Sequence, residues 1–454
     1  MIATDAIATP LLSALVGAEF LQRHDLPGFN RAFPGHACHP GELPFSTWFQ
    51  EKDLRQIAAI TNGDPIPRPL ALHVHFPSHA DLGATSEPQA RSAAYLTRIY
   101  REIAMLAALF DRDRQVEQVH FAGWTLGFLK PEQVVEVMDV LSRHFSLFAA
   151  PRTARSIRID PCSTSAQDIA QLAEAGFDRA ILAACKRCDE GCKGRWNIAH
   201  LPELVSTCRA HGFSQVQVDL LLDLAWRDEA ELARALGALL QARPDRLRIG
   251  GDEASPLDLA TRTERLRRTL DMLQQAGYSH LGMYCFALPG DELFQARQRG
   301  ALHLDLLGYS ARAECDIVGV GLGAVSQLGA SISHSLPKLS AWEDAIDRGR
   351  LPVWRGIRLD EELLLRADVV QQLICRGELE LGEINRTHGV DFRERFAEAL
   401  RRLEPLVAER LVELSPERMR VTMRGRFALP TLASCFDGAS TACAGFPPRS
   451  LHAP

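Results

Sequence analysis

Short apolar runs recur between residues 70 and 290, and amphipathic stretches separate them. The strand-like runs are 70–76, 117–122, 155–160, 178–184, 215–221, 246–250 and 279–286. The helix-like stretches include 88–110, 131–146, 165–175, 229–241 and 258–276. A repeat of roughly 30–40 residues is the length of one strand–helix unit with its connections. The pattern predicts a parallel, partly closed barrel whose functional groups lie in the loops after the carboxyl ends of the strands.

The segments on either side of these repeats have different patterns. Residues 1–65 carry Pro and Gly with weak periodicity, which indicates an N-terminal arm before a barrel over 66–330. Residues 331–436 are mostly helical in pattern, and the tail 437–454 is rich in Gly, Ala, Pro and Ser, a composition typical of disorder. The predicted fold class is α/β, a partial parallel (β/α) barrel with an N-terminal arm and a small, mostly helical C-terminal domain.

The composition argues against some classes of binding partner. Of the 454 residues, 46% are hydrophobic and 24% charged, and the formal net charge is -6. Basic residues are dispersed among acidic ones, which argues against a nucleic-acid surface because phosphate binding needs clustered positive charge. No uninterrupted apolar run is long enough to span a membrane. The 11 cysteines do not suggest a disulfide framework in a chain of this length, so we expect a cytoplasmic, reducing setting.

Four long segments point to a known family. They are LGMYCFALPGDELFQARQRGALHLDLLGYS (281–310), CDIVGVGLGAVSQLGA (315–330), VWRGIRL (353–359) and LPTLASCFD (429–437). In these segments the chain resembles the oxygen-independent coproporphyrinogen III oxidases of the radical S-adenosylmethionine superfamily, and the likeness runs from about residue 20 to 436. The resemblance implies a partial α/β barrel and a tetrapyrrole substrate. The family uses a [4Fe–4S] cluster and S-adenosylmethionine to convert two propionate side chains of that substrate to vinyl groups.

The family's cluster motif is altered in this chain. Family members carry three cysteines spaced Cys-x3-Cys-x2-Cys after the first strand, and these thiolates hold the iron–sulfur cluster. The matching positions here are His79, Gly83 and Ser86. Glycine supplies no ligand, and the serine hydroxyl is a hard ligand poorly suited to iron–sulfur chemistry. The sequence therefore predicts that the standard cluster ligands are lost. A family tyrosine six residues before the first cysteine is also replaced, by His73.

The motif that approaches the cofactor's methionine moiety is also altered. The family sequence Gly-Gly-Gly-Thr-Pro reads Ala122-Gly123-Trp124-Thr125-Leu126 here. Gly123 and Thr125 match the family motif and are the candidate cofactor-binding residues that remain. Trp124 puts an indole where the cofactor would lie. The S-adenosylmethionine site is thus expected to be degenerate.

Two charged positions on later strands bear on the same site. Arg158 stands where the family has a glutamate near the cofactor, whereas Asp219 matches a family acidic position. Asp219 is therefore a candidate cofactor-binding residue. The alternative is that Asp219 is a strand-end residue that caps a helix.

One group of cysteines could form a relocated metal site. Cys185, Cys188 and Cys192 are spaced Cys-x2-Cys-x3-Cys and follow the fourth predicted strand, which places them at the barrel mouth. Three thiolates could hold a [4Fe–4S] cluster, or Zn²⁺ with a fourth ligand such as His79. The alternative is three free thiols in a charged loop.

Two further features are substrate-binding candidates through the resemblance. Gly319, Gly321 and Gly323 form a Gly-x-Gly-x-Gly run that corresponds to the floor of the family's substrate pocket. Arg355 matches a family arginine and would pair with a propionate, since guanidinium groups bind carboxylates well. A structural salt bridge is the alternative for Arg355.

These observations lead to one hypothesis and two alternatives. The leading hypothesis is a tetrapyrrole-binding, carrier or regulatory paralogue of the family that has lost the standard cluster ligands. The first alternative is an active oxidase of coproporphyrinogen III, or of a related porphyrinogen, with its cluster relocated to the three cysteines. The second is a zinc-stabilised interaction protein. Whether the chain is an enzyme, and whether it holds a cluster, S-adenosylmethionine, haem, another porphyrin or Zn²⁺, stays open at this point.

Overall fold

The fold was analysed in a computed structural model of the chain. The residues that the structure describes are 20, 45–77, 88–123, 129–148, 152–161, 164–183, 200–222, 229–251, 257–312 and 315–436. Most of the predicted N-terminal arm and the whole tail 437–454 lie outside them.

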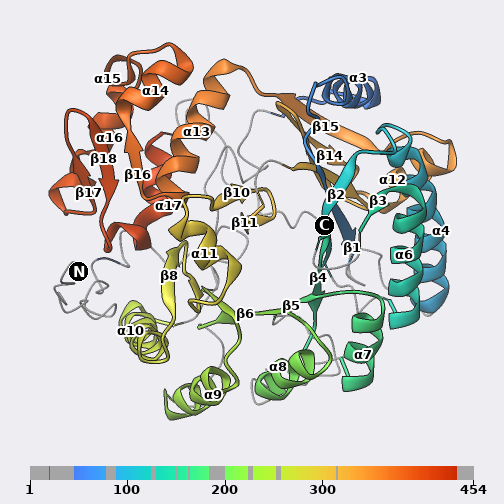
Figure 1. Cartoon of the computed structure of the whole chain (residues 1–454), viewed down its shortest axis with the longest axis horizontal. Helices are drawn as coiled ribbons and strands as arrows, with labels where there is room; N and C mark the ends of the chain where they lie inside the picture. Colours follow the sequence, from blue (N-terminus) through green and yellow to red (C-terminus); the bar gives the residue numbers. More distant parts are fainter. Residues whose placement is uncertain are drawn as a thin grey trace.

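The first half of the chain forms parallel strands with helices on one side. The strands are β1 (Leu70–Phe76), β2 (Gln115–Gly123), β4 (Ala154–Ile159), β5 (Arg179–Ala183), β6 (Gln215–Leu221) and β7 (Arg246–Gly250), with the two-residue β3 (Ser146–Leu147) beside β2. The helices are α4 (Pro88–Ala107), α6 (Pro131–His144), α7 (Ala166–Glu174), α8 (Leu201–Ala210), α9 (Glu229–Ala242) and α10 (Leu259–Gln275). Figure 1 shows these helices along the outer side of a curved sheet. The strand–helix alternation predicted from the sequence is confirmed.

Side-chain alternation explains why these segments form strands. In β1, Leu70, Leu72, Val74 and Phe76 are fully buried, whereas alternate positions face the other side of the sheet. Successive side chains of a strand point to opposite faces, so one face of β1 packs into the hydrophobic core. The other, concave face is therefore free to carry polar groups.

The sheet stays open in the described part of the chain. It has 13 strands, and its path runs from β15 at one end to β8 at the other without closing. The segment 279–286, predicted as one strand, is a hairpin of β8 (Ser279–Gly282) and β9 (Cys285–Ala287). Met283 and Tyr284 turn the chain with φ of 51° and 54°, although neither residue type favours such angles. Both side chains are buried, so tertiary packing overrides the local preference.

An extension continues the sheet beyond β1. It consists of β12 (Asp316–Val320), which runs parallel to β1, and β13 (Val325–Leu328), β14 (Ser331–Ser335) and β15 (Val353–Arg358), which follow with antiparallel pairing. The outer edge of β15 is met by residues before α3 (Glu51–Asn62), where Ser46 and Gly356 exchange two backbone hydrogen bonds of 2.9 and 3.1 Å. The sheet thus runs past residue 331, and the division of the chain into domains stays a proposal.

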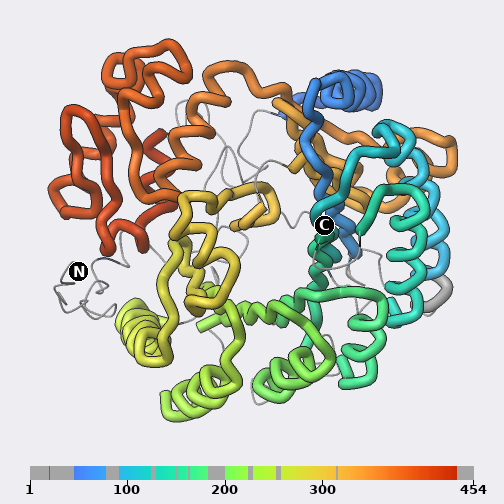
Figure 2. The backbone as a smooth tube through the Cα atoms, in the orientation of Figure 1, coloured from blue at the N-terminus to red at the C-terminus, as the bar shows by residue number. Residues whose placement is uncertain are grey.

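Helices dominate the end of the chain. They are α12 (Leu339–Asp347), α13 (Glu361–Cys375), α14 (Leu381–His388), α15 (Phe392–Arg395), α16 (Ala397–Ala408), the 3₁₀ helix η4 (Gly425–Ala428) and α17 (Leu429–Cys435). A small sheet pairs β16 (Glu378–Glu380) and β17 (Val412–Leu414) with β18 (Arg418–Val421). Figure 2 shows the part of this region from α13 onward, in orange to red, beside the segment that holds β8, α11 (Glu292–Gln298), β10 (His303–Asp305) and β11 (Gly308–Ser310), whereas α12 lies against α4. There His280 of β8 stacks on Phe427 with ring centroids 4.1 Å apart.

These observations confirm the predicted fold class, a mixed α/β fold with a large, mainly parallel open sheet. Within the described ranges, no helix has both the length and the apolar character needed to cross a lipid bilayer.

One buried ion pair joins the parallel strands to the extension. Arg114, just before β2, donates to Asp316 at the start of β12, and both side chains are almost fully buried. The remaining guanidinium N–H groups donate to Arg68 O, Thr61 Oγ1 and Asn62 Oδ1 at 2.8–3.0 Å. Asp316 also accepts from the backbone N–H of Gly329 at 2.9 Å, at the β13–β14 turn. The end of α3, the residue before β2, the start of β12 and the β13–β14 turn thus meet at this ion pair.

We expect Arg114→Met to lower the free energy of unfolding by about 3–5 kcal/mol, because it leaves a buried carboxylate without its counter-ion. Arg101→Met is the matched control, since Arg101 pairs with Asp347 on the surface and such pairs contribute about 1 kcal/mol or less. Urea unfolding of both variants measures the difference. Equal losses in the two variants would contradict the role assigned to the Arg114–Asp316 pair.

Candidate functional site

The concave face of the parallel strands is polar. His73 and His75 of β1 lie on it, and the register places His73 beside His120 of β2. His120 is in turn beside Ser156 of β4. A buried sheet face of this kind normally carries apolar residues. Polar side chains from neighbouring strands that converge here mark a candidate binding surface.

Asp219 is the most buried charge on this face. Its carboxylate accepts from Arg248 Nη2 at 2.6 Å and from Gln217 Nε2 at 2.7 Å. Arg158 Nη1 lies 3.6 Å from the same carboxylate. Burial pushes the pKa of Asp219 upward, but Arg248 and Arg158 outweigh it and hold the pKa below its usual value. Asp219 is therefore a charged carboxylate with two arginine partners. These contacts with side chains differ from those of a residue that caps a helix, which would accept from backbone N–H groups.

Histidines occupy the neighbouring strands. The His73 and His120 rings stack with centroids 5.5 Å apart, and His75 lies 6.2 Å from His73. His120 Nδ1 is 2.6 Å from Ser156 Oγ. Burial, with the nearby charge of Arg158, lowers the pKa of His120 to about 4, and burial also lowers the pKa of His73. Both imidazoles are thus neutral at physiological pH. Over the described ranges, no group of three or more His, Cys, Asp or Glu side chains has metal-binding geometry.

A cavity of about 220 Å³ lies against this face. The charged residues that line it are Arg158, Arg179, Arg246, Arg248, Arg312, Asp219 and Glu292. Arg179 pairs with Glu292, and Arg246 pairs with Asp291 at 2.9 Å. Arginines outnumber carboxylates in the lining. The cavity is smaller than the roughly 300–1,000 Å³ of typical small-molecule sites, so it suits a small or anionic group and not a macrocycle.

Arg355 lies on the same concave face, on the antiparallel extension. Across neighbouring strands, Ala71 is paired with Ile317, Ile317 with Gln327, Gln327 with Ile332, and Ile332 with Ile357. Directly paired residues point to the same side of a sheet, so these side chains share one face. His334 is two residues from Ile332 and is paired with Arg355. Both therefore project on the side that carries His73.

Aromatic rings hold the Arg355 guanidinium. Its central carbon lies 4.8 Å from the Phe45 ring centroid and 4.2 Å from that of Trp354. Burial lowers the pKa of Arg355, and no carboxylate of the described residues offsets this effect. Arg355 Nε and the buried His334 Nε2 have no hydrogen-bond partner in the same part of the chain. The salt bridge that was the alternative for Arg355 is thus not seen among the described residues.

Three of the predicted glycines are explained by close backbone packing. A Cβ on Gly123 would lie 2.0 Å from the Phe76 carbonyl oxygen, where β1 and β2 end together. A Cβ on Gly321 would lie 2.4 Å from the His75 carbonyl oxygen, and one on Gly319, in β12, would lie 2.4 Å from the Val325 carbonyl oxygen. Gly323 follows in the next loop. Packing suffices to require glycine at the first three positions, and the ligand-binding roles of all four stay predictions.

The loop after β12 is fixed by helix α4. Gly321 N–H donates to Glu102 Oε2 and Leu322 N–H donates to Tyr95 Oη, both at 3.0 Å. The Tyr95 hydroxyl donates to His75 O at 3.2 Å. Burial raises the pKa of the Glu102 carboxyl to about 8. A neutral acid and a tyrosine therefore position the glycine loop against the end of β1.

Several predicted site residues fall outside the described part of the chain. They are the degenerate cluster positions His79, Gly83 and Ser86, the cofactor-site residue Thr125, and the cysteines Cys185, Cys188 and Cys192. Their roles stay predictions.

The sequence analysis identified Arg158 but missed the other arginines of the concave face, Arg179, Arg246, Arg248 and Arg312, and the aromatic frame of Arg355. One signal was available for the arginines. In the predicted strand 246–250, RLRIG, Arg246 and Arg248 alternate with apolar residues, and this spacing puts both guanidinium groups on one face. Phe45 and His334 lie far from Arg355 in the sequence, and no local pattern joins them.

Comparisons with known proteins bear on the family and the fold. Residues 359–428 match the family model of the HemN C-terminal domain. An oxygen-independent coproporphyrinogen III oxidase of Pseudomonas aeruginosa is 31% identical over 448 residues, covering 92% of this chain and 95% of the relative. The Salmonella typhimurium protein of that name is 28% identical over 90% of this chain and 93% of the relative. The solved structure of Escherichia coli coproporphyrinogen III oxidase (HemN), described as a radical SAM enzyme, matches with a TM-score of 0.79 and 27% identity, over 89% of this chain and 97% of that one.

Glu102 gives a test of the loop geometry. An unfolded chain releases this proton near its ordinary pKa of 4.5, whereas the folded protein keeps it until about pH 8. The free energy of unfolding should therefore fall by about 1.4 kcal/mol per pH unit between these values, about 5 kcal/mol in all. Glu102→Gln should remove this fall, since the amide still accepts from Gly321 N–H.

Urea unfolding from about pH 5 to about pH 8 measures the slope. Glu174→Gln, on the exposed side of α7, is the control and should keep the wild-type slope. If Glu102→Gln and wild type lose stability in parallel as the pH rises, the neutral carboxyl is not the group responsible.

Proposed function

Because this chain belongs to the family of oxygen-independent coproporphyrinogen III oxidases, we propose that it is a tetrapyrrole-binding carrier or regulatory protein of haem metabolism that lacks the family's standard radical chemistry. The observation that carries this proposal is the double arginine pairing of Asp219. The family resemblance gives Asp219 a role beside a cofactor whose sulfonium and ammonium groups are positively charged. In this chain the carboxylate already has two cationic partners.

Arg158 is the residue that changes the charge of the site. It takes the place of a family glutamate and lies 3.6 Å from Asp219. A glutamate and Asp219 together would attract a cation, whereas Arg158, Arg248 and Asp219 leave the group net positive. A cationic ligand would have to displace a guanidinium from a fully buried carboxylate. The residues present therefore do not fit S-adenosylmethionine, and we derive no chemical step through it.

The sequence at the cluster positions supports the same proposal. His79, Gly83 and Ser86 cannot replace three thiolates, because an iron–sulfur cluster needs soft sulfur ligands. Trp124 adds bulk in the second motif. The cluster motif, the motif at 122–126 and the charge at position 158 are thus altered together, although all three would serve one cofactor. This joint change supports the proposal that the chain does not bind that cofactor.

Arg355 supports retained recognition of a carboxylate. Its guanidinium is half-buried, is framed by Phe45 and Trp354, and contacts no acidic residue in the described part of the chain. His334 Nε2, beside it on β14, is buried without a partner. The half-buried guanidinium of Arg355 is the group on this strand that suits a carboxylate. We propose that it binds a propionate side chain of a tetrapyrrole.

The cavity size limits how such a ligand lies. A tetrapyrrole would cover the concave face, because the 220 Å³ cavity beside Asp219 is too small to enclose a macrocycle. The cavity's excess of arginines would accept a second carboxylate arm. In this arrangement the protein holds and orients the ligand, and no described residue is assigned a covalent role.

We expect Arg355→Gln to weaken binding of coproporphyrin III by about ten- to a hundredfold, the effect of losing one charge-assisted hydrogen bond of about 1.5–3 kcal/mol. Absorbance and fluorescence titration under reducing conditions measures the dissociation constant. Arg348→Gln is the matched control, since Arg348 is an exposed arginine on the surface. The tetramethyl ester of coproporphyrin III should bind wild type and Arg355→Gln equally weakly. Wild-type protein without affinity for coproporphyrin, its reduced form or haem would refute the proposal.

A second experiment separates this proposal from the relocated-cluster alternative. The protein is purified anaerobically and reconstituted, and its iron and sulfide are measured beside a variant with Cys185, Cys188 and Cys192 all changed to Ala. We expect neither protein to retain stoichiometric iron. About four irons per chain in wild type and none in the variant would instead establish a relocated [4Fe–4S] cluster and favour an active oxidase. Stoichiometric Zn²⁺ without porphyrin binding would favour an interaction protein.

A further inference from the structure

The cavity beside Asp219 continues toward the amino ends of the parallel strands. There it is lined by Ser156 of β4, Arg179 of β5 and Gln215 of β6, together with the start of α11 and residues of β11. Gln215 precedes Asp219 by four residues, which is about 13 Å at about 3.3 Å per residue of strand. The predicted cofactor motifs follow the carboxyl ends of β1 and β2, so this part of the cavity lies away from them.

The strand register brings three polar side chains into one row. Ser156 is paired with Arg179, and Arg179 is paired with Gln215. Neighbouring strands lie about 4.8 Å apart, and paired side chains point to the same face. All three side chains are partly exposed, whereas the next residue of β6, Val216, is fully buried. The row is therefore a polar, accessible strip on the concave face of the sheet.

Arg179 has a donor that its ion pairs leave unused. Its Nη1 donates to Glu292, and its Nε lies 3.8 Å from Asp178. Nη2 makes no hydrogen bond to any described residue and retains accessible surface, in agreement with the 19% exposure of the side chain. Glu292 and Asp178 thus hold the guanidinium in place, and one of its N–H edges remains open to the cavity.

Gln215 contributes a second donor beside it. Its Oε1 is buried without a hydrogen-bond partner, whereas its Nε2 retains accessible surface and makes no hydrogen bond within the described ranges. Because Gln215 and Arg179 are directly paired on adjacent strands, their N–H groups lie side by side. Two adjacent donors, one of them charged, suit a single oxyanion.

The surroundings of this row are electropositive. Arg158 follows Ser156 by two residues in β4, so it faces the same side of the sheet, and 34% of its side chain is exposed. Burial is the main cause of the low pKa of His120, and the charges of Arg158 and Arg248 lower that pKa further, each by more than Asp219 raises it. The charges around the cavity therefore favour an anion over a cation.

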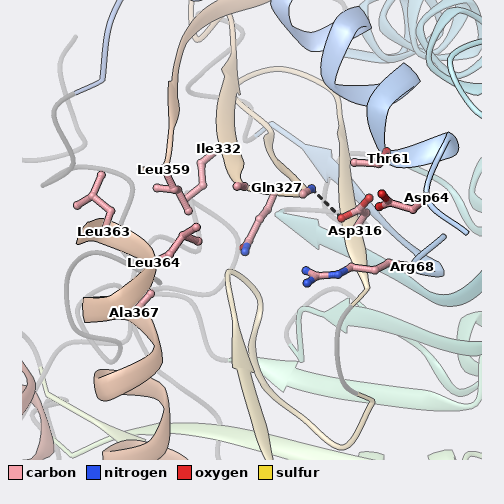
Figure 3. A pocket seen from close by; sticks show the side chains of 12 residues that line it. Thr61, Asp64, Arg68, Asp316, Gln327, Ile332, Leu359, Leu363, Leu364 and Ala367 are labelled. Carbon is pink, nitrogen blue, oxygen red and sulfur yellow. Dashed lines mark hydrogen bonds between the residues drawn. The ribbon is translucent and has the colours of Figure 1, made fainter. Parts of the chain in front are cut away.

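The other cavity of the molecule lacks such an opening at its charged group. It has a volume of about 300 Å³ and lies between α13 and the start of β12. Figure 3 shows its carboxylate, Asp316, which Arg114 and the backbone N–H of Gly329 already satisfy. The cavity with the Arg179 row is thus the better candidate for a ligand.

We propose that the amino-end part of this cavity binds a free tetrahedral oxyanion of the phosphate class. Arg179 Nη2 and Gln215 Nε2 would donate to two of its oxygen atoms, and Arg158 would add positive charge from the neighbouring strand. A tetrahedral dianion presents oxygen atoms in several directions, as donors from adjacent strands require, whereas a carboxylate presents two in one plane. The cavity of about 220 Å³ is small for a nucleotide, which favours the free ion.

The test is isothermal titration calorimetry of the full chain with inorganic phosphate, in a phosphate-free buffer held at constant ionic strength. We expect one saturable site per chain and a rise in melting temperature, because a ligand that binds only the folded state stabilises it. Sulfate should bind comparably. Acetate and adenosine monophosphate should each bind about tenfold more weakly or worse, and the latter separates a free ion from the phosphate group of a nucleotide. Equal effects of phosphate and acetate would overturn the proposal.

Two variants assign binding to the Arg179 row. Gln215→Glu keeps the size of the side chain and gives Arg179 Nη2 a carboxylate of the protein's own. It should fold at least as stably as wild type and bind phosphate about tenfold more weakly or worse. Arg179→Gln should show the same loss of binding, and if it folds poorly, Gln215→Glu still decides the question.

Arg348→Gln, on the surface, is the matched control and should bind phosphate as wild type does. Absence of phosphate binding in wild type, or undiminished binding in Gln215→Glu, would overturn the proposal. The inference is independent of the tetrapyrrole site, since Arg355→Gln should also bind phosphate normally. Failure of either proposal is therefore distinguishable from failure of the other.

Discussion

The parallel strands and the extension meet at a buried ion pair, between Arg114 and Asp316. The pair fixes the start of β12 against the start of β2, and the neighbouring hydrogen bonds bring the end of α3 and the β13–β14 turn to the same point. A closed barrel holds its first and last strands by their mutual hydrogen bonds. This sheet has no such closure in its described part. The parallel ladder between β1 and β12, from Leu70 and Asp316 to Val74 and Val320, aligns the extension with the parallel strands, and the ion pair at its start reinforces that alignment. The position of Arg355 follows from it.

Electrostatics on the concave face is governed by desolvation. Buried imidazoles stay neutral, and the fully buried Asp219 stays charged because two guanidinium groups lie beside it. On α4, outside this face, the buried Glu102 carboxyl keeps its proton. Charged groups in such surroundings need partners, since an isolated buried charge is strongly unfavourable. Arg158, one of the two partners of Asp219, therefore contributes to keeping that carboxylate charged.

The sequence predicted the parallel strands and their helices well, because each strand alternates or runs apolar over a short length and each helix has one apolar face. It failed where tertiary contacts outweigh local preference. Neither of the two turn residues, Met283 and Tyr284, is a glycine or an asparagine, so their residue types do not indicate a turn. The serine-rich strands of the extension lack a strong apolar pattern. The family likeness drew attention to Asp219 and Arg355. It also placed Arg158 at the site of Asp219, but it could not give the partners Arg248, Phe45 and His334, which come from distant segments.

An open sheet has two free edges, and this chain covers each with a segment remote in sequence. Ser46 exchanges backbone hydrogen bonds with Gly356 at the β15 edge, and Phe427 stacks on His280 of β8 at the other. Unpaired edges are templates for aggregation. During synthesis, β8 emerges from the ribosome long before Phe427 does, whereas Ser46 is already present when β15 forms. The nascent chain therefore passes through a stage in which the β8 edge lacks its cover, and its yield in the cell should depend on chaperones that bind extended segments until translation is complete.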